Sequence, residues 1–231
     1  MPPSAPENVA LSRETLAAST ERTLRPASRA KPAIILANWA GRRVIVKDFS
    51  RNSWLLRQLY GRWVVRHESR IYARLAGVEG VPAFHGRLDA FAFAVDYVEG
   101  ASLKTLPRKS LPPDVFGRLA ALQRAIHARG VVHLDTHQSK NVLIAPDGRP
   151  CLVDFATSIY LGSNWLARRI FVPLMGLADR LGFHKLRVRY CAGLPAPAAR
   201  RQRRLIAFLS WLWPPSALRR LARALRPRSR K

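Results

Sequence analysis

The chain has 231 residues, 48% of them hydrophobic, so it can bury a core in one domain or in two small lobes. Its formal net charge of +26 favours phosphates, nucleic acid or an anionic membrane surface as a partner. Its two cysteines, Cys151 and Cys191, exclude a disulfide-rich framework and have no close partner at metal-ligand spacing. We therefore expect a globular protein of a reducing compartment.

The positive charge is concentrated near the C-terminus, where residues 180–231 carry fifteen Lys or Arg and no Asp or Glu. Residues 1–24 lack a basic start followed by an apolar core, so we expect no secretory signal. Charges interrupt the longest apolar region, residues 159–183, which argues against a membrane-spanning helix. The expected location is the cytoplasm, with peripheral contact at the inner face of the cytoplasmic membrane as an open option.

The first part of the chain predicts a leader and a β-hairpin. Residues 1–25 are rich in Ser, Ala, Pro and Thr, and this composition predicts a flexible leader or a weak helix. Residues 33–36 and 43–48 are two runs of the β type, rich in Ile and Val, and a turn containing Gly41 separates them. These two runs predict a hairpin.

A long helix and two further strands are expected next. Residues 54–76 have apolar side chains at helical spacing, and Gly77 follows. Glu68 falls on the same stripe, because residues three and four apart share one face of a helix. The segments 82–88 and 91–97 are predicted as two further strands, which lead into a linker at Gly100.

The second half is predicted to be mainly helical. A helix is expected over residues 114–129, with Asp114 as its N-cap and Gly130 as its stop signal. The runs 141–145 and 151–155 flank the turn sequence PDGR and predict a second hairpin. We expect the rest to be helical, interrupted by prolines. The predicted class is therefore α+β, with a small antiparallel sheet and one helix followed by a mainly helical part.

Lys47 and Glu68 form a candidate pair. A strand over residues 43–48 would direct Lys47 to one face and Val46 and Asp48 to the other. A lone lysine there is more often a solvated residue that protects a sheet edge, and a lone glutamate more often reaches solvent at the edge of its stripe. Burial of Glu68 on an apolar stripe, however, requires a nearby cation, and Lys47 comes from the element just before it.

The sequence GVVHLDTHQSKNVLI, residues 130–144, contains further polar candidates. Phosphoryl transfer needs a carboxylate that orients the attacking hydroxyl, oxygen ligands for Mg²⁺ and a cation at the phosphates. Asp135 fits the first role and Asn141 the second, and Asp154 lies thirteen residues beyond Asn141. A hairpin between Asn141 and Asp154 would bring both side chains to one magnesium site. The bland alternative is a polar turn before a buried strand.

The ordered set VIVK, the helix glutamate, AVDYVEG, HLD with its asparagine, and VDF resembles the protein-kinase-like superfamily over residues 30–185. Within it the chain is most similar to small bacterial RIO-like kinases and to lipopolysaccharide kinases that phosphorylate Kdo or heptose. The resemblance implies a two-lobed kinase-like fold. Its expected parts are a flexible leader over 1–25, an N-lobe over 26–99, a C-lobe over 100–215 and a basic tail over 216–231.

The resemblance also implies a role for each motif residue. Lys47 would contact ATP phosphates, Glu68 would hold Lys47, and Asp135 would orient the acceptor hydroxyl. Asn141 and Asp154 would bind Mg²⁺, while His133 would support its loop through hydrogen bonds. The backbone from Ala94 through Asp96 to Val98 would line the adenine pocket.

The chain departs from the family pattern at four points. Gly41 is the only glycine between residues 1 and 60, so no glycine-rich loop precedes Lys47. Leu134 stands where the HRD arginine is usual, and Ala156 where the DFG glycine is usual. The interval from Asp135 to Asn141 is one residue longer than in the common kinase loop. These departures keep a pseudokinase binding module open as an alternative.

Several function classes therefore stay open. The first is an ATP-dependent phosphotransferase that acts on a sugar hydroxyl of a lipopolysaccharide core or a related anionic glycolipid. A RIO-like Ser/Thr protein kinase is the alternative acceptor class, and a nucleic-acid-binding protein would rest on charge alone, without a recognisable fold signature. The segment 200–213 joins an arginine cluster to tryptophans, which suits either a bilayer interface or an ordinary packed helix. The sequence carries no signal for oligomeric state.

Overall fold

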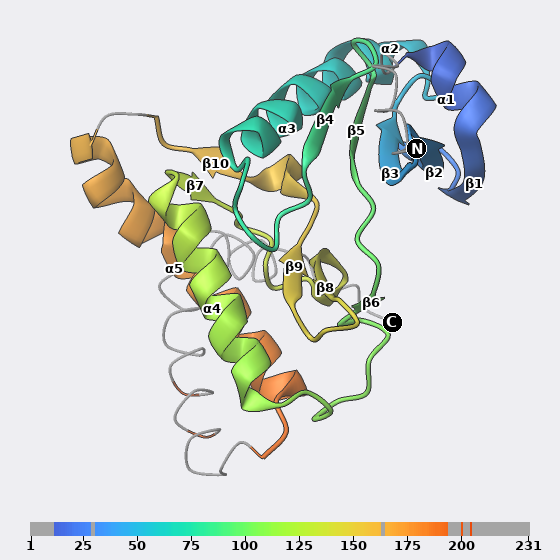
Figure 1. The fold of residues 1–231 in the computed structure, drawn as a ribbon. Helices are drawn as coiled ribbons and strands as arrows, with labels where there is room; N and C mark the ends of the chain where they lie inside the picture. The colour runs from blue at the N-terminus through green and yellow to red at the C-terminus, as the bar shows by residue number, and fades with distance from the viewer. Residues whose placement is uncertain (1–11, 29–30, 163–164, 194–199, 201–203, 205–231) are drawn as a thin grey trace, which may run out of the picture. The chain divides into compact units, whose positions relative to one another are not determined.

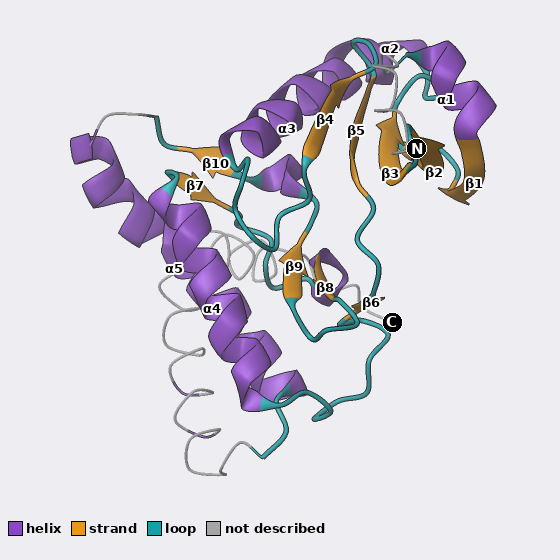
Figure 2. Ribbon diagram, viewed as in Figure 1, coloured by secondary structure: helices purple, strands orange, loops and turns teal. Residues whose placement is uncertain are grey.

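The computed structural model describes residues 12–28, 31–162, 165–193, 200 and 204 (Figure 1). The fold is α+β, as the sequence predicts (Figure 2). The segment 200–213, apart from Arg200 and Arg204, and the tail 216–231 lie outside the described residues. The predictions for these two segments therefore stay predictions.

A five-stranded antiparallel sheet with the order β1-β2-β3-β5-β4 dominates the first part of the chain. Its elements, in chain order with the helices among them, are α1 (Arg13–Ser19), β1 (Thr20–Arg25), β2 (Ala33–Trp39), β3 (Arg42–Asp48), α2 (Trp54–Leu56), the π-helical turn η1 (Arg57–Gly61), α3 (Arg62–Arg74), β4 (Phe84–Arg87) and β5 (Ala92–Asp96). The predicted hairpin is β2–β3, whose register runs from Ala33 opposite Asp48 to Trp39 opposite Arg42. The two further predicted strands are β4 and β5.

The later elements are short strands and two long helices. They are β6 (Ala101–Ser102), α4 (Pro113–Ala128), β7 (Val131–Val132), the 3-10 turn η2 (Ser139–Asn141), β8 (Val142–Ile144), β9 (Pro150–Leu152), the 3-10 turn η3 (Phe155–Thr157), β10 (Ile159–Tyr160) and α5 (Trp165–Tyr190). The strands β8 and β9 are neighbours in the order β6-β8-β9, as predicted for the second hairpin.

Three local features differ from the sequence predictions. The described part of residues 1–25 contains a strand as well as a helix: β1 is exposed on both faces and pairs with β2 at the sheet edge. The predicted helix over 54–76 contains the π-helical turn η1. Helix α4 starts at Pro113 with Pro112 at the N-cap, so Asp114 lies in the first turn instead, because proline is preorganised for the start of a helix.

The chain forms two compact units. The first comprises the described residues up to Gly100 together with Ala145–Asp147 and Cys151–Ser158. The second comprises Ala101–Ile144, Gly148–Pro150 and the described residues from Ile159 onward. The segment around Asp154 thus belongs to the first unit, whereas the predicted C-lobe over residues 100–215 includes it.

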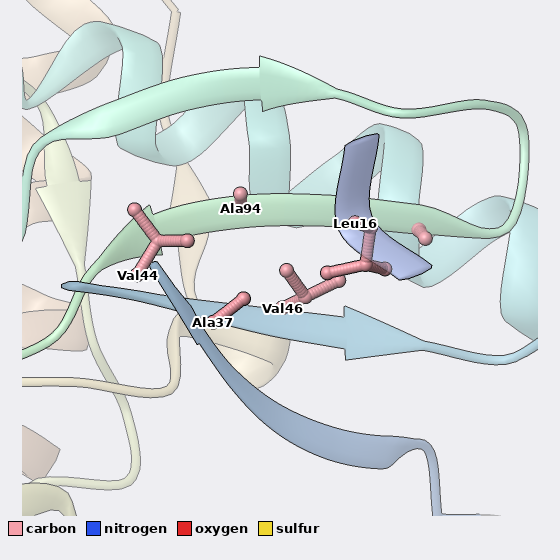
Figure 3. Packing of buried hydrophobic residues seen from close by; sticks show 6 residues of the cluster. Leu16, Ala37, Val44, Val46 and Ala94 are labelled. Carbon is pink, nitrogen blue, oxygen red and sulfur yellow. The ribbon is translucent and has the colours of Figure 1, made fainter. Parts of the chain in front are cut away.

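The two faces of the sheet in the first unit carry different elements. One face packs under helix α1, and its buried cluster consists of Leu16, Ala37, Val44, Val46, Ala92 and Ala94 (Figure 3). The Arg13 guanidinium fixes α1 there, because it donates to both oxygens of buried Asp48 at 2.6 and 3.0 Å. On the other face, α3 contacts β4 and β5 through buried side chains that include Tyr72. Lys47 points to this second face, as strand alternation predicts.

In the second unit, helix α4 packs on α5. Phe116 of α4 and Phe183 of α5 meet edge to face, with ring centroids 6.3 Å apart. The antiparallel pairs β7–β10 and β6–β8 flank the polar segment that follows β7. None of the helices that the structure describes is long and apolar enough to cross a membrane.

Candidate functional site

A buried ion cluster joins three of the predicted residues within the first unit. Lys47 Nζ on β3 donates to Glu68 Oε1 on α3 at 2.6 Å and to Asp154 Oδ1 at 2.9 Å. Glu68 is fully buried, Lys47 is 13% exposed at its side chain and Asp154 is 36% exposed. The lysine is therefore held by one inaccessible carboxylate and one that solvent or a ligand can reach.

The electrostatics of this cluster keep Lys47 charged. Burial opposes the ammonium form, but the Coulomb attraction of Glu68 and Asp154 outweighs it and raises the pKa of Lys47 above its usual value. Burial also raises the pKa of Glu68, against the opposing effect of Lys47. Glu68 Oε2 is buried without a hydrogen-bond partner among the described residues, so Lys47 is the main compensation for this carboxylate.

The segment around Asp154 is tied to α3. The Phe155 N–H donates to Glu68 Oε1 at 3.0 Å, and the Asp154 N–H donates to the Tyr72 hydroxyl at 3.4 Å. The Phe155 ring packs edge to face on Tyr72 with centroids 5.1 Å apart. Asp154 adopts φ +67°, which costs about 1–3 kcal/mol for a residue other than glycine and persists only where the surroundings impose it. The bonds of the Asp154 N–H to Tyr72 and of the Phe155 N–H to Glu68 hold the backbone at and just after this residue.

A second cluster lies in the second unit, around Asp135. Asn141 Nδ2 donates to Asp135 Oδ2 at 3.1 Å and to the Asp135 carbonyl at 3.3 Å. Gln138 Nε2 also donates to Oδ2, and His137 Nδ1 lies 3.4 Å from Oδ1. His133 Nδ1 accepts from the Asp135 N–H at 3.3 Å, so His133 supports the loop as predicted. The side chains of Gln138 and Asn141 thus fix the orientation of the Asp135 carboxylate.

Asp179 of α5 anchors the loop that carries Asp135. Its carboxylate accepts from the N–H groups of His133 and Leu134, each at 2.8 Å, and from the Thr136 hydroxyl at 3.0 Å. It also lies 2.9 Å from His127 Nε2. Burial opposes ionisation of Asp179, but the hydrogen bond to His127 and the interactions with His133 prevail and hold its pKa below the usual value. An ionised, 1% exposed carboxylate therefore organises the backbone of residues 133–136.

The loop is held in a strained conformation against α5. Leu134 adopts φ +64°, a region that a branched side chain rarely occupies. The Leu134 N–H donates a hydrogen bond to Asp179, so the residue with the strained backbone is also one that Asp179 anchors. A Cβ at Gly182 of α5 would lie 2.7 Å from the backbone nitrogen of His137, so only glycine permits the helix to approach the loop this closely.

The predicted adenine-binding backbone lies on β5 and just after it, in the first unit. Ala94 is fully buried within the cluster under α1, and Asp96 bonds His85 Nε2 at 2.6 Å. The Asp96 N–H donates to the Ala83 carbonyl at 2.9 Å, and the Tyr97 N–H to the Arg43 carbonyl at 2.9 Å. The N–H of Val98 has no backbone partner in the part of the chain that the structure describes. Of the N–H groups over residues 96–98, that of Val98 is thus the candidate donor to a ligand.

The predicted site residues therefore form two groups. Lys47, Glu68 and Asp154 lie together in the first unit, and Asp135 and Asn141 lie together in the second. The predicted pairing of Asn141 with Asp154 joins residues of different units and stays a prediction. Sequence reasoning missed Asp179 and Gln138. The available signal for Asp179 was a single acid in a helix that is otherwise apolar and basic.

The donor chemistry of both groups fits a hard cation. Asp154 offers a partly exposed carboxylate, and Asn141 uses its amide nitrogen toward Asp135, so its carbamoyl oxygen is the acceptor that remains. Such oxygen donors suit Mg²⁺, which commonly takes one or two protein ligands together with phosphate oxygens. No group of three or more His, Cys, Asp or Glu side chains suited to a metal occurs among the described residues.

No protein-family model matches the chain, and no curated protein is significantly similar to it.

Proposed function

We propose that the protein is an ATP-dependent phosphotransferase of the kinase-like fold. The main support is the ion cluster in which Lys47 contacts fully buried Glu68 at 2.6 Å and partly exposed Asp154 at 2.9 Å. A buried lysine held between two carboxylates is costly to build for stability alone, because hydrophobic residues would serve as well or better. It is useful where a fixed cation must meet phosphate oxygens.

In this proposal each site residue has a role toward ATP, Mg²⁺ or the acceptor hydroxyl. Lys47 contacts nucleotide phosphates, and Glu68 keeps its ammonium in place. Asp135, oriented by Gln138 and Asn141, accepts a hydrogen bond from the acceptor hydroxyl and directs its oxygen at the phosphorus. Asp154 and Asn141 would hold Mg²⁺, which supplies positive charge to the phosphate oxygens. Val98 would donate its N–H to the adenine, with the backbone from Ala94 and Asp96 lining the ring.

The proposed acceptor is a sugar hydroxyl of a lipopolysaccharide core or a related anionic glycolipid, with the protein at the inner face of the cytoplasmic membrane. The net charge of +26 supports an anionic acceptor but does not distinguish a glycolipid from an acidic protein. A RIO-like Ser/Thr protein kinase is therefore the alternative acceptor class within the same proposal.

Transfer of labelled phosphate from ATP to lipopolysaccharide precursors and to a generic protein acceptor tests the proposal. Asp135→Ala should lower transfer by about 10²–10⁴-fold, because the acceptor loses its orienting carboxylate. Asp114→Ala is the matched control, because Asp114 is an exposed acid on α4 that pairs with Arg118 at 2.8 Å. Equal transfer by wild type and Asp135→Ala would contradict the mechanism, and the preferred acceptor would distinguish the two classes.

A pseudokinase binding module is the second candidate, and the connection between β1 and β2 favours it. Its sequence PASRAKP, residues 26–32, contains no glycine that could cover phosphates. The phosphotransferase proposal predicts a rise in melting temperature with ATP that needs Mg²⁺ and disappears in Asp154→Ala. A module that binds no nucleotide would give no rise in either protein.

A further inference from the structure

Exposed apolar side chains gather on one helical stretch of the first unit. Helix α2, the turn η1 and the start of α3 follow one another without a break (Figure 1). Five large hydrophobic side chains there are exposed, namely Trp54 (66%), Leu55 (62%), Leu59 (68%), Tyr60 (44%) and Trp63 (56%). We call this surface the 54–63 face. Apolar groups that protrude together in this way usually mark an interaction surface.

The opposite side of the same helical stretch is packed, which fixes the 54–63 face outward. A Cβ at Gly61 would lie 2.9 Å from Phe49 Cβ, so glycine permits the close approach at this point. Val64 and Val65 are buried in the next turn. On the outer side, Trp63 stacks with Tyr60 at 6.4 Å and with His67 at 5.0 Å between ring centroids. The aromatic rings are thus ordered against each other while they stay exposed.

The surroundings of the 54–63 face are cationic. Between residues 49 and 78 the only acid is Glu68, and it is fully buried. Arg62, Arg66 and Arg70 are exposed, and their helical spacing brings them to the side of α3 that carries Trp63. Leucine and tryptophan side chains therefore protrude next to a row of arginines without an exposed acid among them.

We propose that the 54–63 face docks on an anionic lipid bilayer. A protruding helix surface with Trp, Tyr and Leu beside Arg suits the bilayer interface, where indole and phenol rings lie at the headgroup boundary and guanidinium groups meet lipid phosphates. A second copy of the chain is disfavoured as the occupant, because two faces with the same arginines, on chains of charge +26, repel each other. The inference does not depend on phosphate transfer, since binding needs no nucleotide.

Sedimentation of the full chain with vesicles tests this proposal. The vesicles contain phosphatidylcholine alone or mixed with phosphatidylglycerol, at low and at physiological salt. The variant Leu55→Ser/Leu59→Ser/Trp63→Ser removes protruding apolar groups that are exposed in the fold, so it should stay folded. It should bind mixed vesicles at least about tenfold more weakly. Leu24→Ser is the matched control, since Leu24 is 41% exposed and lies on the edge strand β1, outside residues 54–63.

Arginine variants separate the electrostatic contribution. Replacing Arg62, Arg66 and Arg70 by Gln should weaken binding to mixed vesicles by about fivefold for each arginine removed and should reduce its dependence on salt. Arg42→Gln, at an exposed position of β3, should have a smaller effect. A circular dichroism spectrum and melting temperature like those of the wild type establish that each variant is folded.

A second readout locates the tryptophans. Lipids with brominated acyl chains should quench part of the tryptophan fluorescence of the bound wild type. Trp54→Phe/Trp63→Phe keeps apolar rings, so it should still bind while that part of the quenching disappears. The proposal would be overturned if the apolar triple variant bound mixed vesicles as strongly as the wild type. It would also be overturned if the wild type did not bind mixed vesicles at low salt. In the first case another segment carries the contact, and in the second the face serves a different partner.

Discussion

Lys47 compensates a carboxylate that has no access to solvent. Glu68 is fully buried, one of its oxygens has no partner among the described residues, and burial raises its pKa. Removing Lys47 would therefore leave a costly buried charge, whereas removing the charge of Glu68 would not. This asymmetry separates the two residues in a stability experiment, although both belong to one ion pair.

We predict that Lys47→Met lowers the free energy of unfolding by about 3–5 kcal/mol, the range found when one partner of a buried ion pair is removed. Adding Glu68→Gln to Lys47→Met should restore part of that loss, because the glutamine carries no charge. Urea unfolding of the two single variants and the double variant gives the coupling energy. Lys104→Met, at an exposed position, is the control. Strictly additive losses would mean that the pair is not coupled.

At this scale the sequence could predict Lys47 and Glu68 because alternation in a strand and periodicity in a helix determine the direction of a side chain. The sequence could not predict the role of Asp179, since the N–H groups that donate hydrogen bonds to its carboxylate belong to residues more than forty positions earlier. Strand alternation and helix periodicity relate only residues within one element, not residues so far apart in the sequence. The lone acid in a basic, apolar helix was the available indication, and it was interpreted only as an obstacle to membrane insertion.

Among the elements, α5 acts on the loop of residues 133–136 through a single carboxylate. Asp179 accepts three hydrogen bonds from this loop and lies against His127 of α4. The same contact supports the left-handed conformation of Leu134. The position of Asp135 in the second unit therefore depends on an anchor in another element.

We predict that Asp179→Asn lowers the free energy of unfolding at neutral pH by about 2–4 kcal/mol, because charge-assisted hydrogen bonds are lost in a buried site. The pKa of Asp179 is depressed in the folded protein, so its stabilisation is complete above the usual value of 3.8 and is lost as the pH falls through the lower folded value. The difference between wild type and variant should then shrink in strong acid.

Urea unfolding at neutral pH and through the acid range measures that difference. Asp114→Asn, an exposed acid on α4, is the control and should show little difference at any pH. A difference for Asp179→Asn that is independent of pH would show that packing, and not charge, explains its effect.

Element prediction was accurate where the side chains of a segment are at least partly buried and failed for the fully exposed strand β1. The predicted strands β2, β3 and β5 contain buried residues, and in β3 these alternate with less buried ones. β1 has every residue exposed, so no apolar period was present to predict it. In the helix after β3, the π-helical turn η1 changes the direction in which the following side chains point around the helix axis. The sequence pattern did not predict this change. The exposed aromatic residues of the 54–63 face lie at this irregularity.

For the whole molecule, ion pairing inside the protein leaves the excess of positive charge undiminished. Among the described residues, the acids Asp48, Glu68 and Asp179 are buried and paired with cations or hydrogen-bond donors. The pairs Asp48–Arg13 and Glu68–Lys47 each remove one acid and one cation, so the formal excess of +26 stays with the other charged residues. Repulsion among exposed cations should destabilise the compact state at low ionic strength.

We predict that sodium chloride raises the melting temperature of the full chain between low and physiological ionic strength. Screening acts within about 10 Å at 0.1 M salt and weakens repulsion between exposed cations, while the buried pairs of Lys47 and Arg13 are screened much less. Each kcal/mol of relieved repulsion should raise the melting temperature by about 2–4 °C. Potassium chloride should act equally, whereas an uncharged osmolyte at the same osmolality should not reproduce the initial steep rise. A melting temperature that falls with salt over this range would mean that surface ion pairs, such as those of Arg43 with Glu21 and Glu99, outweigh the excess positive charge.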